Sequence, residues 1–106
     1  MALASDSIET VMDVLDPVFP IQVRAARALL GWTQKQLAFN AGVSEPFINR
    51  LERAERLGHV SKLRQLRDAL DRAGVEFHTT DDGYGVMLRG PKAEERRNQL
   101  HTSGAA

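Results

Sequence analysis

Cysteine is absent from this 106-residue chain, which excludes disulfide bonds and zinc sites built on thiolates. Also absent is an apolar run of the roughly 18–20 residues that a membrane-spanning helix needs. No basic residue precedes Arg24, so the N-terminus lacks the positively charged start of a secretory signal. We therefore expect a cytoplasmic protein without a membrane partner.

Residue types used for catalysis or metal binding are few and scattered. The three histidines, His59, His78 and His101, are far apart in the sequence, so neither a metal cluster nor a catalytic triad is evident. No glycine-rich phosphate loop is present. The acidic pair Asp81 and Asp82 precedes Gly83 in a pattern typical of a turn. We therefore expect neither enzyme activity nor a bound cofactor or metal ion.

The formal net charge is zero, but the charges are unevenly distributed along the chain. Residues 1–20 contain four acidic and no basic residues, whereas residues 21–72 contain ten basic and five acidic ones. Residues 73–106 carry a net charge of −1. A basic middle segment fits a polyanionic partner, and it fits a solvated, arginine-rich helical surface equally well.

Apolar residues at helical spacing predict a short acidic amphipathic helix over residues 6–15, closed by Pro17 and Pro20. Pro20 can also open the next helix, because its missing N–H costs nothing in a first turn. This second helix should run to about Leu30 and end at Gly31. Its expected apolar face consists of Ala25, Ala28 and Leu29.

Residues 33–53 carry the signals of two short helices joined by a tight turn. Thr33 and Gln36 have the spacing of a capping box, which favours the start of a helix. Gly42 can turn the chain through a positive φ, and Ser44 can cap the second helix. The joint between the helices should be buried by four apolar side chains, Leu37, Val43, Ile48 and Leu51.

A further helix and a β-hairpin are predicted after these two helices. Ser61 is a candidate cap for a helix that ends at Gly74. The apolar stripe of this helix consists of Leu63, Leu66, Ala69, Leu70 and Ala73. Residues 75–79 alternate like a strand, and residues 86–89 can return beside them after a turn at 81–83.

The segment from Trp32 to Arg53 resembles the helix-turn-helix of Cro/CI-type, or Xre-like, repressors. The matching positions are Thr33, Gln34, Leu37-Ala38, Ala41-Gly42-Val43-Ser44, Ile48 and Leu51-Glu52. The resemblance extends over about residues 20–73. It implies a mainly α, lambda-repressor-like bundle of about five helices, to which this chain adds a short C-terminal β-hairpin. The alternative is a generic αα-hairpin in a small helical bundle.

The resemblance also implies roles for single residues. The recognition-helix positions that face the DNA groove are Glu45, Pro46, Phe47, Asn49 and Arg50. Gln34 matches a glutamine that touches the DNA backbone, and Arg27 and Glu52 match an ion pair between the first helix and the recognition helix. Arg50 is the best candidate to read a base, because its guanidinium can hold guanine O6 and N7 together. Further backbone contacts are expected from Arg24, Arg53, Arg56 and Lys62.

Three positions depart from the pattern of this family. Glu45 and Pro46 stand where Gln or Ser is frequent, and Ala54 stands where a glycine commonly follows the recognition helix. We expect a sequence-specific, duplex-DNA-binding transcriptional regulator, a repressor that acts as a dimer through the major groove. The alternative is a protein-interaction module on the same fold, an antitoxin or antiactivator that holds a protein partner.

We expect four segments: the acidic N-terminal segment 1–19, the DNA-binding domain 20–74, the hairpin 75–90 and a flexible tail 91–106. A lone two-stranded hairpin is marginal in water and leaves open edges. Pairing with the hairpin of a second copy would give a four-stranded sheet and a homodimer. The competing arrangement folds the hairpin back onto its own bundle, with the acidic helix covering what remains.

Overall fold

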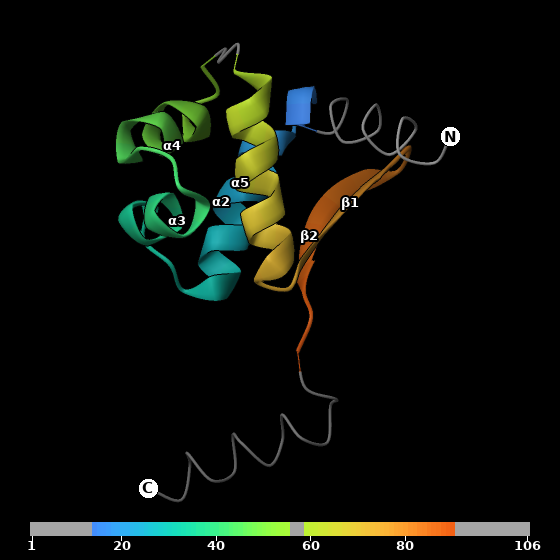
Figure 1. Ribbon diagram of the computed structural model, residues 1–106. Coiled ribbons are helices and arrows are strands. Elements are labelled where there is room, and N and C mark those ends of the chain that lie inside the picture. Colours follow the sequence, from blue (N-terminus) through green and yellow to red (C-terminus); the bar gives the residue numbers. More distant parts are fainter. Residues whose placement is uncertain (1–13, 56–58, 91–106) are drawn as a thin grey trace, which may run out of the picture.

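The computed structural model describes residues 14–55 and 59–90. Four helices and one antiparallel hairpin are complete within these residues: α2 (Phe19–Leu30), α3 (Gln34–Ala41), α4 (Glu45–Glu52), α5 (Val60–Arg72), β1 (Val75–Thr80) and β2 (Gly83–Leu88). In Figure 1, α3 and α4 lie on one side of the α2–α5 pair, and the hairpin lies on the other. The fold is therefore mainly α with a C-terminal hairpin, as the sequence predicts.

Two of the predicted segments fall wholly or mostly outside the described residues: the tail 91–106, and all but the last two residues of the helix 6–15. Arg56, a predicted DNA-backbone contact, also lies outside them. Val14 and Leu15 are helical, in agreement with the end of that predicted helix.

The ends of α2, α3 and α4 follow the local signals in the sequence. Pro20 lies in the first turn of α2, and Gly31 ends this helix with a φ of 69°. Thr33 Oγ1 accepts a hydrogen bond from the backbone N–H of Gln36 at 3.0 Å, and the backbone N–H of Thr33 donates to Gln36 Oε1 at 2.8 Å. Gly42 has a φ of 71°, which supplies the turn between α3 and α4.

The buried face of α2 differs from the prediction. Ala25, Ala28 and Leu29 are exposed. The side chains that α2 buries are those of Phe19, Gln22, Val23 and Ala26. Burying Phe19, Val23 and Ala26 removes more apolar surface from water than burying Ala25, Ala28 and Leu29 would, and this difference sets the rotation of the helix.

The predicted cap of α5 is also wrong. The helix begins at Val60 with His59 as its N-cap, and Ser61 lies inside the first turn. Val60 packs against the core, which draws the start of the helix two residues earlier than Ser61 would allow. The apolar stripe is confirmed at Leu63, Leu66, Ala69 and Leu70, and Ala73 is half-buried.

The core joins the helices and the hairpin. Among its fully buried side chains are Leu37 of α3, Ile48 of α4 and Leu66 and Leu70 of α5. Val75, the first residue of β1, is fully buried as well. Val43 is half-buried and packs against the core, as predicted for the turn. The hairpin is therefore part of the hydrophobic core.

The hairpin packs one face on its own bundle. The pairs Val75–Leu88 and Phe77–Val86 lie on this inner face, and all four side chains belong to or contact the core. The Phe77 ring lies 5.7 Å from the Phe19 ring between centroids. This is the competing arrangement of the sequence analysis, in which the hairpin folds back onto the bundle. A dimer through the hairpin would have to use its edges or its outer face.

A buried glutamine ties α2 to the hairpin. Gln22 Nε2 lies within 3.1–3.2 Å of three acceptors, namely His78 O, Thr79 Oγ1 and Gly85 O. These acceptors come from both strands, so one side chain links α2 to β1 and β2 together. The sequence pattern does not predict this role for Gln22, because its three partners lie 56–63 residues away along the chain.

Candidate nucleic-acid interface

The outer face of α4 is exposed, while its inner face anchors it in the bundle. Ser44 caps the helix by accepting a hydrogen bond from the backbone N–H of Phe47 at 3.2 Å. Ile48 and Leu51 are buried, which fixes the rotation of the helix. Of the residues predicted to face a DNA groove, four are exposed on this helix: Glu45, Pro46, Asn49 and Arg50.

Phe47 does not face a groove, which corrects the prediction for this residue. Only 7% of its surface is exposed, and the side chain belongs to the core. Phe47 lies four residues before Leu51, so both side chains fall on the buried face of α4. That spacing was visible in the sequence. The Lys62 ammonium lies 5.8 Å from the centre of the Phe47 ring, so Lys62 stands beside α4 at the start of α5.

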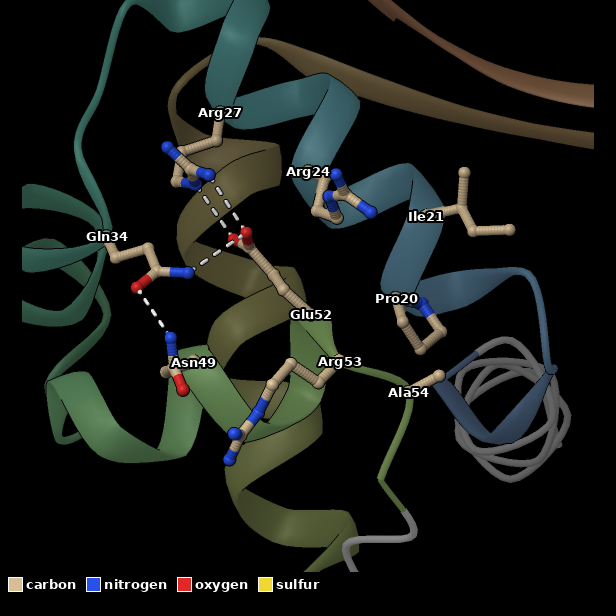
Figure 2. Close-up of a pocket in the computed structure, with 9 residues that line it drawn as sticks. All are labelled: Pro20, Ile21, Arg24, Arg27, Gln34, Asn49, Glu52, Arg53 and Ala54. Atoms are coloured by element: carbon tan, nitrogen blue, oxygen red, sulfur yellow. Dashed lines mark hydrogen bonds and ion pairs between the residues drawn. The ribbon is translucent and has the colours of Figure 1, made fainter.

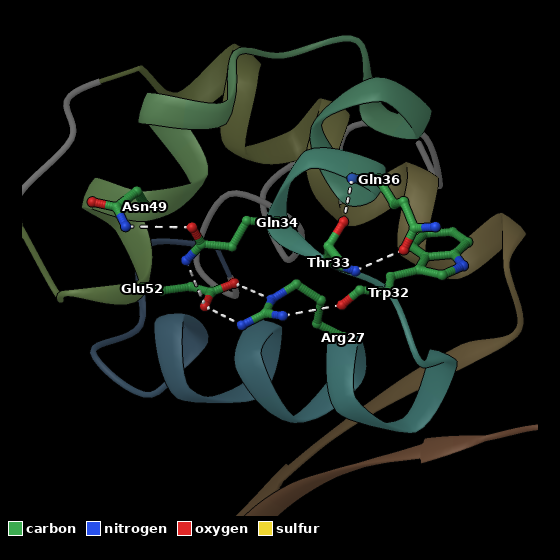
Figure 3. Close-up of polar contacts among 7 residues, drawn as sticks. All are labelled: Arg27, Trp32, Thr33, Gln34, Gln36, Asn49 and Glu52. Atoms are coloured by element: carbon green, nitrogen blue, oxygen red, sulfur yellow. Dashed lines mark hydrogen bonds and ion pairs between the residues drawn. The ribbon is translucent and has the colours of Figure 1, made fainter.

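Arg27 and Glu52 form the predicted ion pair, shown in Figure 3. Arg27 Nε donates to Glu52 Oε2 at 2.8 Å, and Nη2 donates to Oε1 at 2.9 Å. A third donor, Nη1, reaches the Trp32 carbonyl at 3.0 Å. The hydrogen bond with Glu52, aided by its charge, raises the pKa of Arg27 although partial burial opposes the shift. The interaction with Glu52 therefore contributes its full stabilisation of the folded state at every pH below the ordinary pKa of Arg27.

The same carboxylate organises two further polar side chains. Gln34 Nε2 donates to Glu52 Oε1 at 3.2 Å, and Asn49 Nδ2 donates to Gln34 Oε1 at 3.3 Å. Figure 3 shows the four side chains of Arg27, Glu52, Gln34 and Asn49 joined by a continuous chain of hydrogen bonds that connects α2, α3 and α4. The sequence predicted a role for each of them but not this connection.

An open depression of about 630 Å³ lies between α2 and the end of α4, and Figure 2 shows the residues that line it. The Arg24 side chain comes from α2, and the Arg53 side chain comes from the residue after α4. Six of the predicted site residues meet here: Arg24, Arg27, Gln34, Asn49, Glu52 and Arg53. Lys62 is not among the residues that line it.

Glu55 is a residue that the sequence analysis missed. Its Oε1 lies 3.1 Å from Arg50 Nε, and its Oε2 lies 2.7 Å from Arg53 Nη2. One carboxylate thus binds two arginines that were predicted to contact DNA. All three side chains are at least 40% exposed, so water weakens both pairs.

Residues 14–55 and 59–90 make up the part of the chain that the structure describes. This part of the chain has no group of three or more His, Cys, Asp or Glu side chains that could hold a metal ion. None of the helices described is both long and apolar enough to span a bilayer.

Residues 23–77, just over half of the chain, match the sequence profile of a helix-turn-helix family. The chain belongs to the Cro/CI-type helix-turn-helix family. This family consists of DNA-binding regulators, so the exposed face of α4 and the depression beside it lie on a DNA-binding domain. A generic αα-hairpin is thereby set aside. None of the curated proteins compared with the chain matches it.

Proposed function

We propose that the protein is a sequence-specific transcriptional repressor that acts in the cytoplasm and binds duplex DNA through the major groove. The observation that carries this proposal is the division of α4 into two faces. Phe47, Ile48 and Leu51 hold one face in the core, and Glu45, Asn49 and Arg50 leave the other accessible. A helix presented in this way can enter a major groove and bring its side chains to base edges.

Basic residues flank this helix where the DNA backbone would pass. Arg24 and Arg53 line the depression beside α4, and Lys62 stands next to Phe47 at the start of α5. Gln34 keeps one amide hydrogen beyond its bond to Glu52, which it can donate to a phosphate. Arg56, outside the described residues, is proposed as a further backbone contact. Arg50 remains our candidate for reading guanine, once Glu55 releases it.

The proposed repressor acts as a dimer, because one helix-turn-helix reads only a few base pairs. Two copies spaced by one DNA turn would read two half-sites. The hairpin is the proposed contact between them. Its two strands pair only with each other in the part of the chain that the structure describes, so each strand has a second edge that another copy could extend.

The test is binding of the full chain to a library of duplex fragments, followed by titration of the best fragment at several salt concentrations. Each phosphate neutralised contributes about −0.9 to the slope of log affinity against log salt. Four basic contacts, Arg24, Arg53, Arg56 and Lys62, therefore give about −3.6 for each bound chain. No duplex binding, or an affinity that does not depend on salt, would contradict the proposal.

Matched variants sharpen this experiment. Arg24→Gln and Arg53→Gln should each reduce the magnitude of the slope by about 0.9, whereas Arg72→Gln, at the end of α5, should leave it unchanged. Glu55→Gln should act in the opposite direction. It frees Arg50 and Arg53 and removes a negative charge, so the affinity should rise about 2- to 10-fold at low salt.

A second candidate function is an antitoxin or antiactivator that holds a protein partner. One observation favours it: Phe39, in the last turn of α3, is 86% exposed. An exposed aromatic ring is frequent at protein interfaces. Duplex binding that is unchanged by Phe39→Ser supports the repressor, whereas an absence of duplex binding favours the protein partner.

A further inference from the structure

Glu52 fixes which atom donates and which accepts in the hydrogen bonds that join it to Gln34 and Gln34 to Asn49. Both carboxylate oxygens of Glu52 accept hydrogen bonds from Arg27, and the Glu52 side chain is only 5% exposed. A carboxylate ion paired with arginine has no hydrogen to donate. Gln34, whose side chain also meets Glu52, must therefore turn its NH2 group toward it.

The orientation of the Gln34 amide determines the orientation of the Asn49 amide on the recognition helix, α4. With its NH2 group on Glu52, Gln34 directs its carbonyl oxygen toward Asn49. Only the NH2 group of Asn49 can meet that oxygen, and Nδ2 does so at 3.3 Å. The Asn49 oxygen consequently points away from Gln34, as Figure 3 shows. A buried carboxylate thus determines which polar atoms Asn49 offers on the exposed face of α4.

Building on the DNA-binding function proposed above, we infer that Asn49 reads an adenine in the major groove and that Gln34 positions its amide. Asn49 keeps its oxygen as an acceptor and one N–H as a donor. Adenine presents the complementary pair, the N6 donor and the N7 acceptor.

The other bases fit this amide less well. Guanine presents two acceptors, O6 and N7, and Asn49 has already given one of its two hydrogens to Gln34. Cytosine offers one donor and thymine one acceptor on this edge, so each can satisfy only half of the amide. Asn49 therefore determines one base of the binding site, an adenine.

The experiment starts with selection of binding sites from randomised duplexes by the full chain. We expect one position of the selected site to lose its preference in Asn49→Ala, and the preferred base there to be adenine. A bidentate base contact corresponds to a preference of about 5- to 150-fold over the other bases. Replacing this adenine with 7-deazaadenine removes N7 and should weaken binding of the unsubstituted protein but not of Asn49→Ala.

The positioning role of Gln34 is tested with Gln34→Met, which keeps the length of the side chain and removes both the oxygen and the NH2 group of the amide. The preference for adenine should fall to the level of Asn49→Ala, and the double variant should show no further change in base preference. A role confined to phosphate binding would instead lower the affinity equally for all four bases. Lys35→Met, the neighbouring exposed residue of α3, should leave the preference for adenine unchanged. Thermal unfolding of each variant confirms that it is folded.

The outcomes separate this inference from the proposed function. If the unsubstituted protein binds no duplex, the proposed function fails and the inference fails with it. If it selects a defined site in which the Asn49-dependent position is guanine, cytosine or thymine, the function stands and the inference is overturned. An adenine preference that survives Gln34→Met overturns the positioning role of Gln34.

Discussion

At the scale of single residues, Ala54 carries backbone strain. It is the one non-glycine residue with a positive φ, 62°, in the part of the chain that the structure describes. The side chain of an L-residue makes this conformation unfavourable by about 1–2 kcal/mol. The sequence had marked the position, because Ala54 stands where the family commonly has glycine.

We predict that Ala54→Gly stabilises the protein. Glycine relieves the strain, and its greater freedom in the unfolded chain offsets part of the gain. The expected increase in the free energy of unfolding is about 0.5–1 kcal/mol, or roughly 2–8 °C in the midpoint of thermal unfolding. Chemical denaturation of both proteins measures the difference directly.

Gly42→Ala is the matched control with the opposite sign. Gly42 has a φ of 71°, and an added Cβ would lie 2.9 Å from Gln65 Nε2. This amide donates to the carbonyl oxygens of Ala41 and Gly42, so its displacement also removes hydrogen bonds at the end of α3. The variant should lose stability. An unchanged or lower stability of Ala54→Gly would show that the left-handed turn at Ala54 is not strained.

Residue roles were predictable where chain spacing or the family resemblance points to them, and not where they depend on side-chain partners that neither reports. The Arg27–Glu52 ion pair was predicted from the resemblance and is confirmed at 2.8 Å. The links from Glu52 to Gln34 and from Gln34 to Asn49 join three helices, and no spacing along the chain reports them. The role of Glu55 was not predicted for the same reason, because it depends on the ion pairs with Arg50 and Arg53.

At the scale of elements, the ends of helices were predicted better than their buried faces. Thr33, Gln36 and Gly42 act on the backbone within a few residues, so their effect is written locally in the sequence. The buried face of α2 depends instead on the hairpin that packs on it. Phe19 and Gln22 are buried because they contact the hairpin, and local spacing in α2 does not report this contact. Ser61 failed as a cap because a tertiary contact of Val60 outweighed it.

The hydrogen bonds of Gln22 give a prediction about the hairpin as an element. Gln22→Leu keeps much of the side-chain volume but removes the bonds to His78 O, Thr79 Oγ1 and Gly85 O. Loss of a buried polar partner typically costs about 1–3 kcal/mol. Amide hydrogen exchange should therefore accelerate in β1 and β2 more than in α3 and α4.

Thr79→Val is the control for this experiment. It removes only one of the three acceptors of Gln22 and leaves the two backbone carbonyls in place. Its effect on exchange in the hairpin should be smaller than that of Gln22→Leu. Equal acceleration in all elements after Gln22→Leu would mean that the hairpin does not open separately from the bundle.

At the scale of the whole molecule, the hairpin is part of the hydrophobic core of its own chain. Val75 is fully buried and Phe77 contacts Phe19, so deleting the hairpin would expose part of the core. The dimer must therefore be tested with the full chain rather than with a fragment that ends at Gly74.

We predict that the full chain forms a dimer, detected by sedimentation equilibrium over a range of protein concentrations. Amide exchange in one strand of the hairpin should slow as the concentration rises, because a second copy would bind its open edge. Exchange in α3 serves as the internal control and should not depend on concentration. A monomer at all concentrations refutes the dimer. A dimer without protection of the hairpin would move the interface elsewhere, with residues 6–19 as the next candidate.

The participation of the hairpin in the core also matters for anyone who transplants this DNA-binding module into another protein. The family match ends at residue 77, in the middle of β1, and begins after Phe19 and Gln22. A fusion cut at those limits would lose the Phe19 ring, the Gln22 amide and all of β2, and it would leave Val75 exposed to water. Val14 also belongs to the core, so the smallest portable unit extends from before Val14 to beyond Leu88, wider than the region by which its family is recognised.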